Sequence, residues 1–377
     1  MSAATLAPTS KPSARWSSSA NLRFSRLVRP TLNRHLLLAL GAAVLLVAIS
    51  AQIGAYDDYN LTAVAIFAVA AAGLTLLTGL NGQLSLGHGA LMAVGAYTAS
   101  LLLKDHELPV VVVLLAAVLT TGIIGIVFGY AAARLRGPYL AGATLTLAVA
   151  LPQLATRYKS VFGGESGLAV APSAPPAWLG ADFPPERWLA WIALAAAVVT
   201  MVLLANLLHS SVGRTFIAVR DNEAAAALAG IDVARTQVLA FVISAACAGL
   251  AGALFGYWSG VTAPAGFGLG LSLQLVTAIV IGGLGSLAGA VWGSLVLVFV
   301  PALTSGMAST LNVPSSVANN LPLAIYGAIL VIAMLAAPHG IQGALRRLLA
   351  MARARWAHIP AGGKKGVMDW DDPAPDP

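Results

Sequence analysis

Charged residues are scarce in this chain. Only 9% of its 377 residues are Asp, Glu, Lys or Arg, whereas 58% are hydrophobic, and none of these four types occurs from Thr236 through Leu345. A soluble domain needs many more charges to cover its core. An ion at the centre of a membrane helix costs roughly 2.5–3.5 kcal/mol, so long charge-free stretches suit lipid. The composition excludes a soluble globular protein and predicts an all-α integral membrane protein.

The sequence also lacks the signatures of most catalytic and cofactor sites. It has no Gly-x-x-x-x-Gly-Lys-Ser/Thr motif, which excludes ATP binding through a P-loop. Because no Ser-His-Asp or His-Glu-x-x-His arrangement is apparent, we expect no catalytic residue, metal site or cofactor in this chain. A single cysteine, Cys247, excludes an intrachain disulfide. The expected membrane segments contain no carboxylate, which disfavours a proton-coupled carrier. Movement of a solute would then be passive or driven by a partner.

Apolar segments recur along the chain, and most reach the roughly 20 residues that a helix needs to cross a bilayer. The ten segments are Leu36–Ile53, Leu61–Leu80, Leu84–Leu103, Leu108–Ala133, Tyr139–Thr156, Trp188–Leu208, Gln237–Trp258, Leu271–Leu284, Leu287–Leu303 and Leu321–Ala337. Leu271–Leu284 is too short, since its helix would span about 21 Å of a core about 30 Å thick. We predict about ten membrane-embedded segments, including broken or half helices. Leu36–Ile53 is interpreted as a retained anchor rather than part of a signal peptide, because the basic stretch before it is long.

The basic residues predict how these segments are oriented. With ten alternating segments starting inside, the cytoplasmic regions hold 17 of the 21 Lys and Arg residues. Merging 271–303 into one span would place the basic C-terminal residues outside, so the split is favoured. The predicted organisation is a disordered basic tail at 1–35, a transmembrane domain at 36–338 and a tail at 339–377, with both termini cytoplasmic. Because this topology accounts for the net charge of +7, no nucleic-acid partner is expected.

Two glycine-rich stretches, 79–90 and 282–289, interrupt the apolar pattern. Such clusters break a helix or let helices approach closely, and paired interruptions in the two halves of a transporter often mark the pathway. We weigh packing and pathway equally. For His88 a hydrogen-bonded structural role is favoured over a ligand or proton carrier. The candidate pathway residues are Gly82, Gln83, Ser85, Gly87, His88, Gly282, Gly283, Gly285 and Ser286.

The loop 211–235 contains a short helix with recognisable ends. Asp221 or Asn222 can cap its start, Gly230 can end it, and Asp232 can cap the helix that follows. A helix of about eight residues is marginal alone, so it should dock on something. It either lies solvated against its own bundle or acts as a lever seated in a partner protein. The candidate coupling residues are Arg220, Asp221, Asn222, Glu223 and Gly230.

Several motifs in order resemble a known family. The stretches Gly79–Tyr97, Arg136–Leu145, Gly163–Leu168, Gly213–Gly230 and Gly282–Gly289 look like those of branched-chain amino-acid ABC permeases. The resemblance covers roughly residues 35–340. The chain departs from the family in its long basic N-terminal extension and in Gly164-Glu165-Ser166, which varies the usual polar pair and leaves the role of Glu165 open.

The resemblance implies an ABC importer permease bundle in the bacterial plasma (inner) membrane. In such complexes the loop Arg220–Gly230 is the coupling helix that fits a groove on the ATPase. The implied partners are a homologous second permease, two cytoplasmic ATPase subunits that bind ATP and Mg, an extracytoplasmic substrate-binding protein and membrane lipid. The alternatives are a urea or simple-sugar permease of the same superfamily, a passive small-solute channel, or a structural membrane protein.

Overall fold

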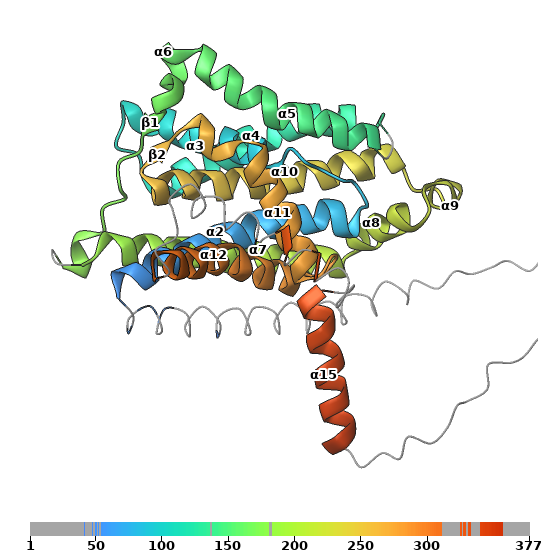
Figure 1. The fold of residues 1–377 in the computed structure, drawn as a ribbon. Helices are drawn as coiled ribbons and strands as arrows, with labels where there is room; N and C mark the ends of the chain where they lie inside the picture. The colour runs from blue at the N-terminus through green and yellow to red at the C-terminus, as the bar shows by residue number, and fades with distance from the viewer. Residues whose placement is uncertain are drawn as a thin grey trace, which may run out of the picture.

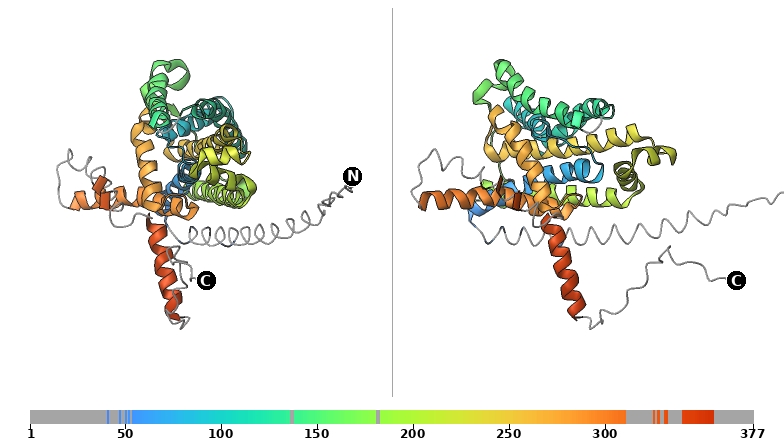
Figure 2. Two further views of the ribbon diagram at one scale, coloured as in Figure 1. Left: turned by 90° about the vertical axis from the view of Figure 1, so that its right-hand side faces the viewer. Right: turned by 45° about the vertical axis from the view of Figure 1, so that its right-hand side comes forward.

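The computed structural model describes residues 54–135, 138–180, 183–310 and 340–356, with a few single residues between 41 and 52 and between 325 and 332. Its long helices run side by side as a bundle, seen lengthwise in Figure 1 and from one end in the left view of Figure 2. The elements are α2 (Ala55–Leu74), η1 (Thr75–Leu80), α3 (His88–Lys104), α4 (Val110–Ala132), α5 (Pro138–Arg157), α6 (Lys159–Phe162), η2 (Gly164–Ser166), β1 (Leu168–Ala169), η3 (Ala177–Leu179), α7 (Pro185–His209), α8 (Ser211–Asp221), α9 (Glu223–Leu228), α10 (Val233–Ser259), β2 (Val261–Thr262), η4 (Pro264–Phe267), α11 (Leu269–Gly282), α12 (Leu287–Thr310) and α15 (Gly340–Trp356).

Helix α10 lies at the centre of the bundle, where it contacts α4, α3 and α2. Its many Ala and Gly residues let neighbouring backbones approach closely, because no large side chain separates them. A Cβ added at Gly95 of α3 would overlap the backbone of Gly249 of α10, and one added at Gly252 would overlap the backbone of Met92. Small residues therefore determine how the helices of this bundle fit together.

Large apolar side chains cover the outside of the bundle. On α4, Leu115, Leu119 and Ile123 are all more than half exposed. A continuous apolar surface of this kind is compatible with lipid and not with water. Six of the described helices are long and apolar enough to span a bilayer. The prediction of an all-α protein that crosses the membrane several times is confirmed.

The predicted number of ten membrane segments is not confirmed. Helix α3 has 17 residues, whereas α12 has 24, of which the part described with its side chains, Leu287–Leu303, is apolar. Two further predicted segments, Leu36–Ile53 and Leu321–Ala337, fall almost entirely outside the described residues, as does the tail 1–35. The described part of the chain therefore holds six helices that are long and apolar enough to cross a bilayer, with α3 and α12 in addition.

The predicted split between residues 271 and 303 is present. Helix α11 ends at Gly282 and α12 begins at Leu287, because Gly283 and Gly285 both have positive φ angles, of 121° and 80°. A left-handed residue ends a helix, and glycine adopts it without a steric penalty. The 3-10 turn η4 lengthens α11 at its start, so that Pro264–Gly282 together reach 19 residues and count as a span. The predicted segment Leu271–Leu284 is therefore part of a longer helical stretch than its 14 residues suggested.

The start of α2 corrects one prediction. The expected segment began at Leu61 and the membrane segments were expected to hold no carboxylate, but α2 begins at Ala55 and includes the fully buried Asp58. The side chain of Asp58 forms an ion pair with Arg187, the third residue of α7, at 3.1 Å. A partner on the neighbouring helix makes the buried carboxylate tolerable. Periodicity of apolar residues could not reveal this pairing.

The two ends of the bundle carry different structures (Figure 1). The end we call the β end holds α6 and the short antiparallel ribbon of β1 and β2, in which Leu168 is paired with Thr262. The opposite end, the α9 end, holds α8 and α9. Helix α15 leaves the bundle toward the α9 end and runs crosswise to the long helices in both views of Figure 2. This helix lies within the predicted C-terminal tail 339–377.

Candidate functional site

The loop at the α9 end folds into two short helices rather than the single helix expected. Helix α8 ends at Asp221, and Asn222 then takes an extended conformation with φ −160°. The Asn222 side chain caps α9 by accepting a hydrogen bond from the Ala225 amide at 3.0 Å. The turn after α9 places Gly230 at φ +84°, and Asp232 caps α10 through the Arg235 amide. The expected caps are confirmed, with Asn222 rather than Asp221 starting α9.

Helices α8 and α9 differ in how they meet the bundle. Phe216 and Val219 of α8 are fully buried, so α8 is docked on the bundle. In α9 only Ala226 is buried, whereas Leu228 is 91% exposed. A six-residue helix has little stability of its own. Helix α9 therefore leaves most of its surface uncovered by the described residues.

Arg220 connects α8 to the first glycine-rich stretch. Its Nη1 donates a hydrogen bond to the Gly79 carbonyl oxygen at 3.0 Å, and its Nε and Nη2 donate to Asp221 Oδ1. The Arg220 side chain also covers Gly82, where an added Cβ would lie 3.0 Å from Arg220 Cγ. The planar guanidinium supplies several donors in a fixed geometry, which allows one side chain to hold two partners. A predicted coupling residue thus contacts two residues of the first break.

The first break begins as a change in helix type. Helix α2 continues into the π-helix η1, and the chain then leaves the helix at Asn81. Gly82 has a φ of +81°, a conformation that glycine adopts far more readily than other residues. The loop 81–87 turns back into the bundle before α3 begins at His88 (Figure 1). The sequence-predicted break is therefore a re-entrant loop.

A chain of amide and carboxylate groups links α9 to this loop. The Gln237 side-chain amide donates to Glu223 Oε1 at 2.9 Å, and the Gln83 amide donates to the Gln237 backbone carbonyl at 3.0 Å. The same Gln83 amide donates to Asn81 Oδ1 at 2.5 Å. Gln83 and Gln237 are both buried. Two hydrogen bonds therefore connect Glu223 to the re-entrant loop through Gln237.

The second break packs directly on the first. A Cβ added at Gly79 would lie 2.5 Å from the backbone nitrogen of Gly285, so the two glycine-rich stretches are in backbone contact. Gly282 is equally confined, because an added Cβ would overlap the carbonyl oxygen of Gly289 in α12. Close packing therefore explains Gly282, whereas positive φ angles explain Gly283 and Gly285. The backbone amide of Ser286 donates to the Gly283 carbonyl at 3.3 Å and completes the turn.

The inner part of the re-entrant loop lies deep in the bundle. His88 is fully buried, and its Nε2 lies 3.1 Å from the Ala70 carbonyl oxygen, in agreement with the expected structural hydrogen bond. A Cβ added at Gly87 would lie 2.5 Å from the Thr144 carbonyl oxygen of α5. The hydroxyl of Thr144 in turn accepts a hydrogen bond from the Leu86 amide at 2.9 Å. Helices α2 and α5 thus hold the loop on two sides.

Buried polar atoms gather along this loop. Within the described part of the chain, the atoms near the loop that lack a hydrogen-bond partner are Thr75 Oγ1, Asn81 Nδ2, Gln83 Oε1, Ser85 Oγ and His88 Nδ1. An unpaired buried polar group is unfavourable by about 1–3 kcal/mol. Five such atoms in fourteen consecutive positions are suited to a polar solute or water passing close by. The arrangement offers uncharged donors and acceptors, with no ionised side chain in the loop itself.

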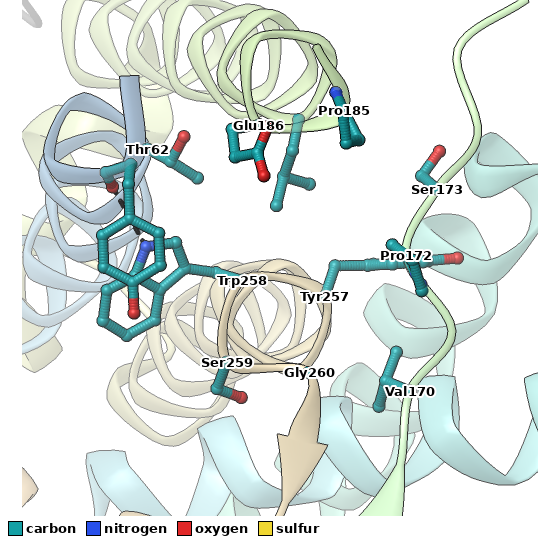
Figure 3. A pocket seen from close by; sticks show the side chains of 12 residues that line it. Thr62, Val170, Pro172, Ser173, Pro185, Glu186, Tyr257, Trp258, Ser259 and Gly260 are labelled. Carbon is teal, nitrogen blue, oxygen red and sulfur yellow. Dashed lines mark hydrogen bonds between the residues drawn. The ribbon is translucent and has the colours of Figure 1, made fainter. Parts of the chain in front are cut away.

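A second feature lies at the β end. A cavity of about 310 Å³ opens between α2, α7, α10 and the segment that includes β1 (Figure 3). Figure 3 shows Glu186 on the α7 side, with Trp258 and Tyr257 of α10 pointing in opposite directions, Tyr257 toward Pro172. The Trp258 ring stacks on Tyr59 with 4.6 Å between ring centroids, and its Nε1 donates to the Tyr59 carbonyl. None of the residues predicted for the pathway or for coupling lines this cavity.

The structure thus brings Arg220, Gly79, Gly82 and Gly285 together at the α9 end. Sequence reasoning missed Gln237, which connects Glu223 to Gln83, and Thr144, which holds the loop. The sequence feature that could have drawn attention to Gln237 is its side-chain amide at the start of a long charge-free stretch. Its partners, however, are distant in sequence and could not be inferred. No group of three metal-ligating side chains occurs in the described ranges.

Comparison with known proteins identifies the family to which the chain is similar. A family model described as branched-chain amino acid transport system, permease component, matches residues 58–334. The high-affinity branched-chain amino acid transport system permease protein LivM of Salmonella typhimurium is 31% identical over 256 residues, covering 62% of this chain and 60% of LivM. The permease protein LivH of the same system and organism is 26% identical over 292 residues, covering 74% of this chain and 91% of LivH.

A more distant relationship is also found. The autoinducer 2 import system permease protein LsrC of an Enterobacter species is 39% identical over 111 residues, 29% of this chain and 32% of LsrC. The chain spans about three-fifths of the length of the LivM relatives that it matches. No solved structure matches the chain significantly.

Proposed function

The chain belongs to the family of permease components of branched-chain amino acid transport systems, and we propose that it is the membrane-spanning permease subunit of an ABC importer that moves branched-chain or other hydrophobic amino acids into the cell. The observation that carries the proposal is the contact of Arg220 with Gly79, which joins the loop at the α9 end to the re-entrant loop. A passive channel needs no such connection.

In this proposal α9 is the lever. Its exposed surface around Leu228 seats on a cytoplasmic ATPase subunit, and its Glu223 carries the movement to Gln237 and on to Gln83. Arg220 provides a second connection, to Gly79. Binding of ATP between two such ATPase subunits would bring the levers together and change the opening of the pathway. In the proposed complex the partner subunits hold ATP and Mg, because the sequence of this chain lacks a P-loop motif.

The proposed pathway follows the re-entrant loop. A zwitterionic amino acid presents a carboxylate and an ammonium group, which backbone amides and carbonyls at a broken helix can meet without a buried ion. The unpaired polar atoms of Gln83, Ser85 and His88 support a polar solute at this position. A homologous second permease would complete the pathway, and an extracytoplasmic binding protein would deliver the substrate to the β end.

Reconstitution tests the proposal. The chain, its companion permease and the ATPase subunits are incorporated into liposomes, and uptake of radiolabelled leucine is measured with the binding protein outside and ATP inside. ATP-dependent uptake of leucine, and none by the chain alone, is expected. Uptake by the chain alone without ATP would indicate a passive channel. ATP-dependent uptake of urea or a simple sugar instead of leucine would support the importer assignment but contradict the proposed substrate.

The orientation is tested separately. Ala225 of α9 is exposed, so an Ala225→Cys variant can be labelled with a thiol reagent that does not cross membranes. Labelling in inverted vesicles but not in intact cells is expected, because the basic loops should face the cytoplasm. Labelling in intact cells would place α9 outside, where no ATPase subunit could bind it.

A further inference from the structure

Helix α15 is attached to the bundle only near its first turn. A Cβ added at Gly340 would lie 2.5 Å from Gly283 Cα, and Trp292 Nε1 of α12 donates to Gln342 Oε1 at 3.0 Å. After Gln342 burial decreases, and Leu348, Leu349 and Met351 are each at least half exposed. Beyond the anchor these apolar side chains are therefore largely uncovered by the described residues.

The sequence of α15 is amphipathic. At 100° per residue, Ile341, Leu345, Leu348, Leu349 and Ala352 fall on one side of the helix. The same helix contains four arginines, Arg346, Arg347, Arg353 and Arg355, and no acidic residue. On the same projection Arg346 falls beside the apolar side and Arg347 near the opposite side. Apolar residues on one side with basic residues beside them are typical of a helix that lies in a membrane surface.

The direction of α15 fits this interpretation. The long bundle helices cross the bilayer, so a helix that runs crosswise to them in two views at right angles runs along the membrane (Figures 1 and 2). Its anchor at Gly283 belongs to the second glycine break, which packs on Gly79 and so lies beside the contact with Arg220. Helix α15 therefore leaves the bundle at the membrane surface on the side of α8 and α9.

We propose that α15 is an interfacial helix that binds the anionic lipid headgroups of the leaflet on the α9 side, with its apolar side buried among the acyl chains. Charge complementarity identifies the occupant, because a helix with four arginines and no carboxylate in its sequence attracts phosphate-bearing lipids. A water-facing position would leave Leu348, Leu349 and Met351 exposed. Since α15 is joined to Gly283, lipid binding holds the second glycine break at a set depth.

Site-specific fluorescence on the full chain tests the proposal. In a Cys247→Ala background, an environment-sensitive probe is attached at Leu348→Cys on the apolar side or at Ala350→Cys on the opposite side. Each protein is reconstituted into phosphatidylcholine bilayers with or without phosphatidylglycerol, and quenching by brominated acyl chains is measured. The probe at 348 should be quenched more than the probe at 350, and more strongly with phosphatidylglycerol.

Charge variants provide the second arm. Each arginine near an anionic surface favours binding by roughly fivefold, so R346Q with R353Q should lower the ratio of bound to free helix roughly 25-fold in phosphatidylglycerol bilayers. High salt should also lower the ratio of bound to free helix, because it screens the attraction between the arginines and the anionic lipids. Equal quenching at 348 and 350, or quenching independent of phosphatidylglycerol, would overturn the proposal. The proposal would also be overturned if brominated lipid did not quench the probe at 348 and added ATPase subunits shielded this probe from water, because a protein would then cover the apolar side of α15. These measurements need no transport, so they are independent of the importer assignment.

Discussion

The guanidinium of Arg220 and the carbonyl oxygen of Gly79 are joined by a 3.0 Å hydrogen bond across 141 positions of the sequence. Gly79 lies where the π-helix η1 meets the re-entrant loop, and it also touches the backbone of Gly285 in the second break. One contact therefore connects the loop at the α9 end with both interruptions of the helical bundle. Because Arg220 is also held by Asp221, its position depends on the end of α8.

Replacing Arg220 with alanine should uncouple ATP hydrolysis from transport. A buried hydrogen bond to a charged group contributes about 1.5–3 kcal/mol. Because the Arg220 side chain is 38% exposed, we expect its hydrogen bond to contribute only about 1 kcal/mol. Its loss should lower the uptake per ATP hydrolysed roughly fivefold. Uptake and phosphate release are measured in the same proteoliposomes. Arg235→Ala is the matched control, because Arg235 forms an ion pair with the neighbouring Asp232 and its side chain is 90% exposed. Equal loss in both variants would contradict the assignment.

Glu223 should act through its hydrogen-bond acceptor rather than its charge. Glu223→Gln keeps an oxygen that can accept from the Gln237 amide, so this variant should retain most of the uptake. Glu223→Ala removes the acceptor and leaves the partly buried amide of Gln237 unpaired, which should reduce uptake about fivefold to tenfold.

The double variant of Glu223 and Gln237 supplies the control for this pair. With both residues changed to alanine, the loss should be smaller than the product of the single losses, because the two groups act through one contact. Independent effects would show that the relay from α9 to Gln83 does not operate. Binding of the ATPase subunits, measured by co-purification, should be similar in all these variants.

Gly79 should not tolerate a methyl group. Gly79→Ala would place a Cβ 2.5 Å from the nitrogen of Gly285, and backbone atoms cannot move aside cheaply. We expect a loss of roughly 1–3 kcal/mol in stability, measured as a lower melting temperature in detergent, and a larger loss of uptake. Gly142→Ala in α5 is the control, since no atom lies within 4 Å of its added Cβ. That change should be neutral or stabilising by up to about 1 kcal/mol. Unchanged stability in Gly79→Ala would argue against contact of the two breaks.

The sequence predicted the membrane helices and the two breaks well, because both depend on local properties. Apolar length and glycine clusters are read directly from neighbouring residues, and the caps at Asn222 and Asp232 follow from the hydrogen bonds that these side chains make nearby. The ends of segments were less accurate. Helix α2 begins six residues before the predicted segment, because Arg187 pairs with Asp58 and lets a carboxylate enter the helix.

Contacts between distant segments could not be predicted. Gly79 with Gly285, Gln83 with Gln237 and Arg220 with Gly79 each join parts of the chain that have no local relation. Their formation depends on how the helices pack, which in lipid is set by small residues and shape rather than by a pattern of polar and apolar positions. For the same reason, no feature of the sequence indicated that the coupling residues lie beside the glycine-rich breaks.

The buried pair of Asp58 and Arg187 should stabilise the β end of the bundle. Asp58 is fully buried, accepts a hydrogen bond from Ser50 and lies 3.1 Å from Arg187, whose side chain is 22% exposed. Removing one member of a buried ion pair costs about 3–5 kcal/mol, and the partial exposure of Arg187 lowers this cost to about 2–3 kcal/mol. Asp58→Ala should therefore melt well below the native protein in detergent.

A matched comparison separates this pair from an ordinary surface contact. Changing both Asp58 and Arg187 to alanine should destabilise less than the sum of the single changes, because the two side chains act through one contact. The reference is Arg235→Ala, which removes an exposed ion pair and should lower the stability by less than about 1 kcal/mol. Asp232→Ala is unsuitable as a reference, because Asp232 also caps α10. If Asp58→Ala melts at the same temperature as Arg235→Ala, water reaches the carboxylate and the pair contributes nothing to holding α2 against α7.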